Sequence, residues 1–184
     1  MSEREATATA GFRPLKLRAR DSEDLQTIAA HLQDALVPLS DTAYLKPEKR
    51  FVLVANRFRW EAGEAEDGAP PPAAPDPAED ARFTDVEDDS GGGRLYERVN
   101  CGVCFDRVRG VRVRGVNPQD RDQILNLLTL EAGPDAITLV FSGGAQIRLD
   151  VSQIRCHIED LGEPWPTRWR PGHDADDAVA NEPR

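Results

Sequence analysis

Two cysteines with the spacing of redox and metal-binding motifs are the first residues that suggest chemistry. Cys101 and Cys104 form a Cys-x-x-Cys pair, a spacing common in redox and zinc sites. The neighbouring apolar residues alternate as in a strand, where positions i and i+3 point to opposite faces roughly 10 Å apart, at ~3.3 Å per residue. That separation exceeds the reach of a disulfide. The pattern therefore favours two small core residues over redox or metal chemistry, unless a bulge at Gly102 brings the sulfur atoms together.

The three histidines form no cluster in the sequence. His31 lies beside the apolar stripe of an expected helix, His157 follows Cys156 on an expected strand, and His173 lies near the C-terminus. Because adjacent residues of a strand point to opposite faces, Cys156 and His157 do not predict a catalytic pair. We assign no catalytic, cofactor-binding or metal-binding residue. An enzyme is the third hypothesis, and its support would be a deep pocket with His31 or His157 near a carboxylate or thiol.

Basic side chains alternate with apolar ones along two segments. Lys16, Arg18 and Arg20 form the first row, and Arg112 and Arg114 form the second. If the apolar partners face the core, both rows share the opposite sheet face, where we expect them to lie side by side and to contact an acidic partner or a nucleic-acid backbone. No aromatic residue interrupts the rows to stack on bases. A binder of RNA or another polyanion is therefore the alternative hypothesis, and a solvated sheet face is the simpler explanation.

A segment near the C-terminus combines tryptophan with arginine. Trp165, Arg168 and Trp169 are residue types that anchor protein interfaces. The leading hypothesis is a non-enzymatic domain that binds a protein partner of unknown identity, either through this segment or through the strand face bearing Arg18 and Arg114. The competing interpretation is that the segment covers an open edge of its own domain.

A repeat at a distance of 96 positions predicts the elements that position these residues. The segment 15–19 matches 111–115, and 21–24 matches 117–120. Each copy predicts a strand with one buried face, a capped helix and then a hairpin. The helix caps are expected at Asp21 and Asn117. The apolar face of the first helix comprises Leu25, Ile28, Ala29, Leu32 and Leu36, and that of the second comprises Ile124, Leu125, Leu127 and Leu128. The hairpin strands are expected at 41–45 with 50–59 and at 136–141 with 145–151.

The predicted fold class is α+β. We expect a two-layer domain built as a tandem pseudo-repeat of β-α-β-β(-β) units, with a mostly antiparallel sheet and two helices on one face. A strand at 96–105 connects the units, and the three prolines after Gly162 indicate irregular structure. The expected divisions are a disordered leader (1–12), the first unit (13–60), a disordered acidic insert rich in Pro, Ala and Gly (61–93), the connecting strand and second unit (94–162), and a Trp/Arg/Pro segment with a disordered acidic tail (163–184).

Charge is distributed unevenly along the chain. The formal net charge is −10, and residues 61–93 hold eleven acidic residues and one basic residue. Residues 13–60 and 94–170 hold 20 basic and 16 acidic residues, a net charge of +4. The predicted folded part is therefore mildly basic, and the insert could fold back over its basic face as an internal competitor.

The chain shows no targeting or membrane-spanning pattern. The first dozen residues lack the apolar core of a signal peptide, and the longest purely apolar run, 51–55, is too short to cross a bilayer. Three cysteines, an odd number, favour reduced thiols over a disulfide framework. We therefore expect a cytoplasmic protein that does not bind membranes, and an exposed sheet edge would allow a homodimer.

Several segments give the chain a family resemblance. They are Leu-Arg-Ala at 17–19 with the acidic residues of 21–24, Ala-His-Leu-Gln-Asp-Ala at 30–35, Asn-Arg-Phe-Arg-Trp-Glu at 56–61, Phe-Asp-Arg-Val at 105–108, Ile-Arg-Leu-Asp-Val at 147–151, and Glu-Asp-Leu-Gly at 159–162 with Pro-Trp at 164–165. With these segments the chain resembles an uncharacterised alphaproteobacterial group, domain-of-unknown-function family 2948. The resemblance implies small cytoplasmic bacterial proteins, with no assigned reaction, ligand or catalytic residue.

Overall fold

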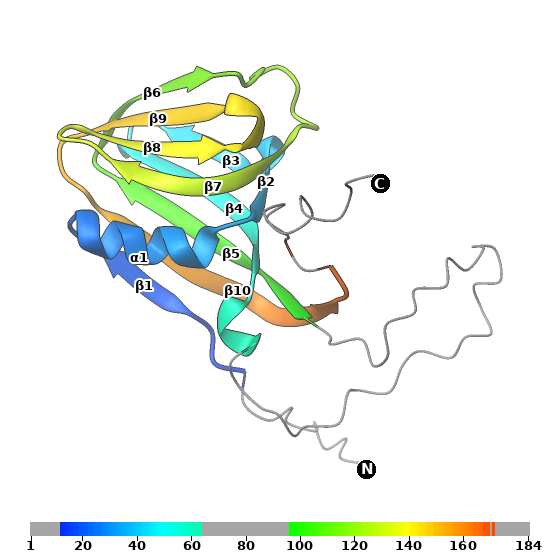
Figure 1. Cartoon of the computed structure of the whole chain (residues 1–184). Coiled ribbons are helices and arrows are strands. Elements are labelled where there is room, and N and C mark those ends of the chain that lie inside the picture. Colours follow the sequence, from blue (N-terminus) through cyan, green and yellow to red (C-terminus); the bar gives the residue numbers. More distant parts are fainter. Residues whose placement is uncertain (1–11, 64–95, 170, 172–184) are drawn as a thin grey trace, which may run out of the picture.

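In the computed structural model, ten strands form one sheet around a single α-helix (Figure 1). The structure describes residues 12–63, 96–169 and 171, and all counts of elements refer to these. The elements are β1 (Lys16–Ala19), α1 (Ser22–Leu32), β2 (Ala35–Pro38), η1 (Leu39–Asp41), β3 (Thr42–Leu45), β4 (Arg50–Phe58), η2 (Trp60–Gly63), β5 (Tyr96–Asp106), β6 (Val108–Arg114), β7 (Ile124–Ala132), β8 (Ala136–Phe141), η3 (Ser142–Gly144), β9 (Gln146–Val151) and β10 (Cys156–Thr167).

The strands pair antiparallel in the order β1-β10-β5-β4-β2-β7-β8-β9-β6, and β3 pairs with β4 beside this path. Strands β1 and β7 are far apart in this order, yet α1 contacts both of them and also β4. The sheet therefore curves around the helix, and the core lies between them (Figure 1).

The first strand and helix form as the sequence predicts. The backbone N–H of Asp24 donates to Oδ1 of Asp21 at 2.9 Å, which confirms the expected N-cap. Three residues of the predicted apolar stripe, Leu25, Ile28 and Leu32, are fully buried. The helix ends at Leu32, so Leu36, which was expected on its apolar face, belongs to β2 instead.

The predicted second helix is wrong, because its residues form β7. Leu125 and Leu127 are buried while Ile124 and Leu128 are exposed, which is the alternation of a strand. A register shift between Leu127 and Thr129 then brings Leu130 into the core. The predicted helical spacing arose because exposed Ile124 and Leu128 combine with buried Leu125 and Leu127 into an i, i+1, i+3, i+4 pattern.

The segment before β7 contains nothing that a helix could bury. Residues 118–123 hold a proline and five polar or charged side chains. The side chain of Asn117 accepts the N–H of Gln119 at 3.2 Å, so it caps a turn instead of a helix. The described part of the chain is thus mainly β, and the predicted α+β domain with two helices on one face is overturned. The second unit of the proposed repeat lacks its helix.

The predicted hairpins of both units are confirmed as β3–β4 and β8–β9. Strand β5 is also confirmed, and its register with both neighbours runs through Gly102 without a bulge. The expectation of irregular structure after Gly162 is wrong, because β10 continues to Thr167. A register shift between Leu161 and Trp165 absorbs part of the proline-rich segment, where no described strand pairs with its other edge.

Alternate residues of β4, β5 and β10 point to two faces of the sheet. The inner face meets the core, and it carries Leu53, Ala55 and Arg57; Cys101, Val103 and Phe105; and Cys156, Ile158 and Asp160. The outer face carries the residues between them, including Arg50, Cys104, Asp106 and His157. This division positions the two polar clusters considered below.

Most of the expected disordered leader, the insert and the acidic tail lie outside the described residues. The exceptions at the start of the insert are residues 61–63, which belong to η2. Within the described residues, no helix has the length and apolar character needed to cross a membrane.

Candidate functional site

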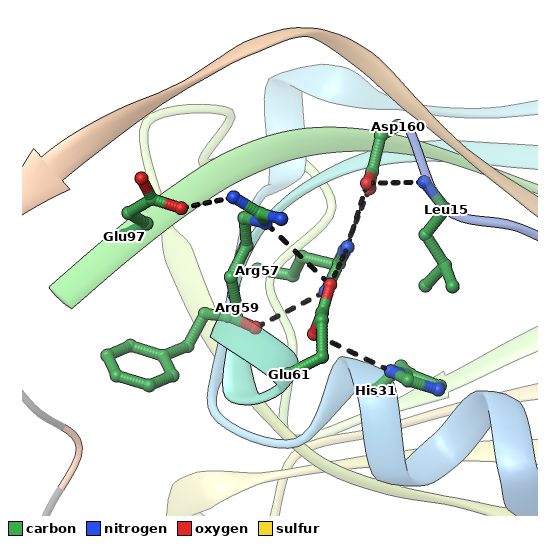
Figure 2. A network of polar contacts seen from close by, with 8 residues as sticks. Leu15, His31, Arg57, Arg59, Glu61, Glu97 and Asp160 are labelled. Carbon is green, nitrogen blue, oxygen red and sulfur yellow. Dashed lines mark hydrogen bonds and ion pairs between the residues drawn. The ribbon is translucent and has the colours of Figure 1, made fainter. Parts of the chain in front are cut away.

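A buried arginine on the inner face is the centre of the first polar cluster (Figure 2). Nε and Nη2 of Arg57 donate to the two carboxylate oxygens of Asp160, both at 2.8 Å. Nη1 and Nη2 donate to the two oxygens of Glu61 at 3.1 and 2.7 Å. The backbone N–H of Leu15 donates to Asp160 at 2.9 Å, which ties the residue before β1 to β10.

The guanidinium of Arg57 has no donor left for a ligand. Besides the four bonds to carboxylates, Nη1 donates to the carbonyl oxygen of Phe58, so all five N–H groups are used. Burial lowers the pKa of Arg57, but its hydrogen bonds to Asp160 and Glu61 more than compensate and raise it above its usual value. The cluster is therefore a closed ion-pair network that holds β4, β10 and η2 together.

The edge of this network is more open. His31 Nδ1 lies 3.9 Å from Glu61, and Arg59 forms ion pairs with both Glu61 and Glu97. A cleft of about 340 Å³ borders these groups, and it is lined by Arg13, Pro14, Leu15, Lys16, Arg59 and Glu61. Lys16, a predicted contact residue, thus lines this cleft, although its ammonium is paired with Glu159 at 2.9 Å.

The outer face holds a second cluster with a different composition. His157 on β10 is the direct register partner of Cys104 on β5, and Asp106 is two residues further along β5 on the same face. One ligand atom from each of the three residues lies within 4.8 Å of the other two. His157 Nδ1 is 3.8 Å from Oδ2 of Asp106, while Oδ1 of Asp106 accepts Nε of Arg50 at 2.8 Å.

The geometry of this cluster does not support nucleophilic catalysis. In a Cys-His-Asp relay the thiol and the carboxylate lie at opposite ring nitrogens, whereas here a single His157 nitrogen is near both groups. Burial raises the pKa of the Cys104 thiol, and the negative charge of Asp106 raises it further. Activation of a cysteine nucleophile requires a lowered pKa instead. The three residues instead offer sulfur, nitrogen and oxygen donor atoms within 4.8 Å of one another, a set that could hold a metal ion.

The structure separates the two predicted cationic rows. Lys16 and Arg18 lie on β1, and Arg112 and Arg114 lie on β6, at the two ends of the sheet order (Figure 1). Arg112 donates to Asp150 at 2.6 Å. Arg20, the remaining member of the first row, lies exposed just after β1. The expectation that the rows lie side by side is therefore wrong, because β1 and β6 occupy opposite edges.

The predicted interface anchors are close together and exposed. Trp165, near the end of β10, is 37% exposed, and Trp169 just beyond β10 is 75% exposed. Leu161, which precedes the register shift of β10, is 47% exposed. Arg168 is also exposed. We call Leu161, Trp165 and Trp169 the apolar edge strip.

Comparison with known proteins assigns the chain to a family. The model of the family described as "Protein of unknown function (DUF2948)" matches residues 15–173. The chain belongs to this family. Neither the curated proteins nor the solved structures contain a match to the chain.

Segments that carry the family resemblance meet at the buried network. Residues 30–35 contribute His31, residues 56–61 contribute Arg57, Arg59 and Glu61, and residues 159–162 contribute Asp160. These segments are far apart in the sequence of this DUF2948 protein, so the network depends on tertiary structure.

Sequence reasoning missed both polar clusters. Glu61 was expected in the disordered insert because the acidic composition begins there, yet it is part of η2 and binds Arg57. His157 was tested as a partner of Cys156 alone, and the carboxylate or thiol that would support an enzyme was left unnamed, whereas the structure places Cys104 opposite His157 on the outer face and Asp106 beside it. The alternation of residues on β5 and β10 could have placed Cys104 and His157 on solvent-facing positions, but only the strand register places them opposite each other.

Proposed function

We propose that this DUF2948 protein is a non-enzymatic domain that binds a protein partner through the apolar edge strip. The observation that carries the proposal is the exposure of two tryptophans and a leucine within nine residues of one sheet edge. Large apolar side chains grouped on a surface are typical of interfaces, and tryptophan is enriched among the residues that contribute most to binding energy. We further propose that the protein is cytoplasmic and that its family is an alphaproteobacterial group.

The edge favours docking of side chains over addition of a partner strand. Among the described residues, no strand pairs with the edge of β10 that faces away from β5 beyond Asp160. Pro164 and Pro166 lie in this part of β10 and carry no backbone N–H. Because a partner strand needs a continuous row of donors and acceptors, the prolines oppose pairing. The tryptophans would instead insert into pockets of the partner.

The alternative, binding of RNA or another polyanion, receives less support. Its five candidate residues are divided between opposite edges of the sheet, and Lys16 and Arg112 are paired with carboxylates. A divided set of cations does not form the continuous basic surface that a nucleic-acid backbone requires.

Site-specific photo-crosslinking in living cells tests the proposal. A photoreactive phenylalanine analogue is placed at position 165 or 169, and also at 124 as a matched control, since Ile124 is an apolar residue of β7 with 62% exposure. We expect discrete protein adducts from 165 and 169 but not from 124. We also expect Trp169→Ala to weaken the adduct formed from 165, because both tryptophans contact one partner.

The size of the adduct identifies the partner class. An adduct with twice the mass of the chain would make the partner a second copy, and a heavier or lighter one would be a different protein. If positions 165 and 169 give no more adduct than 124, the apolar edge strip is not an interface and the proposal is wrong. Crosslinks to RNA from positions 18 and 114 alone would favour the alternative.

A further inference from the structure

We propose that Cys104, Asp106 and His157 form a binding site for one divalent transition-metal ion, with Zn²⁺ as the best fit. The three residues come from two paired strands and offer one cysteine sulfur, one carboxylate oxygen and one imidazole nitrogen within 4.8 Å of one another on the outer face. This is the mixed sulfur, nitrogen and oxygen donor set that zinc accepts, and it is unsuited to calcium or magnesium, which prefer oxygen alone.

The distances require only small side-chain movements to reach a tetrahedral site. Zinc bonds of about 2.0–2.3 Å at tetrahedral angles place ligand atoms roughly 3.3–3.6 Å from each other. His157 Nδ1 and Asp106 Oδ2 are already 3.8 Å apart, and all the ligand atoms lie within 4.8 Å. Since the strand register fixes the three backbones, closing the site needs rotation about side-chain bonds alone.

Arg50 orients one ligand. Its Nε holds Oδ1 of Asp106 at 2.8 Å, while Oδ2 is directed toward His157. Outer-shell hydrogen bonds of this kind fix the orientation of metal-binding carboxylates. Asp106 would therefore bind the metal ion through Oδ2 alone, because Oδ1 accepts the hydrogen bond from Arg50.

The fourth position faces solvent and would take an anion. The summed charge of the site is +1, from the Cys104 thiolate, the Asp106 carboxylate, the Arg50 guanidinium and a divalent ion. Arg18 adds a further positive charge on the same face, because it pairs in register with His157. A site of three protein ligands with a positive surrounding favours hydroxide, a carboxylate or a phosphate as the fourth ligand. Metal binding displaces the thiol proton to solvent.

The test uses the full-length chain without an affinity tag, freed of metal with a chelator. Titration calorimetry with Zn²⁺ is expected to give one site, and Co²⁺ is expected to give a thiolate-to-cobalt charge-transfer band. Cys104→Ser, Asp106→Asn and His157→Gln should each weaken Zn²⁺ binding by about 100-fold or more, beyond the roughly 10–100-fold cost of losing an outer-shell partner. Cys104→Ser should also remove the band.

Matched variants separate this site from other ligands. Cys101→Ala removes a buried thiol from the inner face of the same strand, His31→Gln removes the other described histidine, and His173→Gln removes the one outside the described residues. All three should keep wild-type affinity. If Zn²⁺ binds the site variants as tightly as the wild type, the ion is held elsewhere, for instance by the acidic segments, and the proposal is overturned.

A measurement on the unaltered chain covers the case in which a variant does not fold. Cys101 and Cys156 are buried, and Cys104 is partly exposed, so an alkylating reagent should modify Cys104 first. Saturating Zn²⁺ should slow this modification at least about tenfold, because a metal-bound thiolate is masked. An unchanged alkylation rate would exclude Cys104 as a ligand and overturn the proposal.

Discussion

Arg57 and Arg50 lie on the same strand, β4, and bind their partners at the same distance, yet they belong to different environments. Nε of Arg57 is 2.8 Å from Asp160, and Nε of Arg50 is 2.8 Å from Asp106. The side chain of Arg57 on the inner face is 0% exposed, whereas that of Arg50 on the outer face is 44% exposed. The two arginines therefore form hydrogen bonds of equal length but differ in how far they are buried.

The difference shows that burial decides what an ion pair can do. On the inner face, removal of one partner would leave a charge without water or counterion, so the network must be complete. On the outer face water can replace either partner, so the pair contributes little and its carboxylate keeps an oxygen directed toward His157. Breaking the inner cluster is therefore expected to be costly, whereas the outer cluster is the proposed metal site.

The largest effect is expected when the buried pair is broken. Arg57→Met should lower the free energy of unfolding by about 3–5 kcal/mol, because the buried carboxylate of Asp160 is left without its cation. Urea denaturation followed by circular dichroism measures the loss. The double variant Arg57→Met/Asp160→Leu should recover part of it, since no deeply buried charge is then unpaired. A loss below about 1 kcal/mol would contradict the distinction between the faces.

Zinc should act on the outer face alone. At a free Zn²⁺ concentration of one hundred times Kd, the free energy of unfolding should rise by about 2.7 kcal/mol, because the ion binds only the folded chain. Thermal denaturation with and without a chelator measures the shift. His157→Gln should abolish the shift, whereas Glu61→Gln on the inner face should retain it. An equal shift in His157→Gln would move the site away from the outer face.

Glu61 should give the inner network its pH dependence. Burial raises the pKa of Glu61. The hydrogen bonds from Arg57 and the backbone, together with the charges of Arg57 and His31, lower the pKa by more than burial raises it, so the folded-state pKa lies below 4.5. A depressed pKa means that ionised Glu61 stabilises the fold above its unfolded-state pKa, and that this contribution disappears as the pH falls through the folded-state pKa.

Glu61→Gln should therefore be less stable than wild type by about 1 kcal/mol at neutral pH, a low value for a hydrogen bond to a charged group because Glu61 is partly exposed. The gap should close as the solution is acidified. Urea curves of both proteins over a pH series measure it. A gap that stays constant with pH would mean that the charge of Glu61 does not matter.

The smallest effect is expected from the matched change on the outer face. Arg50→Met should leave the urea midpoint unchanged within reproducibility, because water solvates Asp106 once its partner is removed. A loss comparable to that of Arg57→Met would show that exposure does not separate the two arginines.

Local chemistry made part of the fold predictable. The strand at 16–19, the Asp21 cap and the apolar stripe of α1 depend on neighbouring residues, and so do the hairpins β3–β4 and β8–β9. The second helix was predicted wrongly because exposed Ile124 and Leu128, together with buried Leu125 and Leu127, have the spacing of an apolar helix face. Which apolar residues of a strand reach the core depends on its pairing with other strands, which local periodicity does not contain.

The amino-acid sequence by itself determined the family, the first strand and helix, and the residue types able to carry charge or bind a metal. The tertiary structure alone decided that Arg57 is buried with Asp160, which is 103 residues away, and that Cys104 faces His157. The physical reason is that strand register and sheet curvature set which distant side chains share a face and which lose contact with water. Burial and proximity of that kind, and not residue type, give the two clusters their different chemistry.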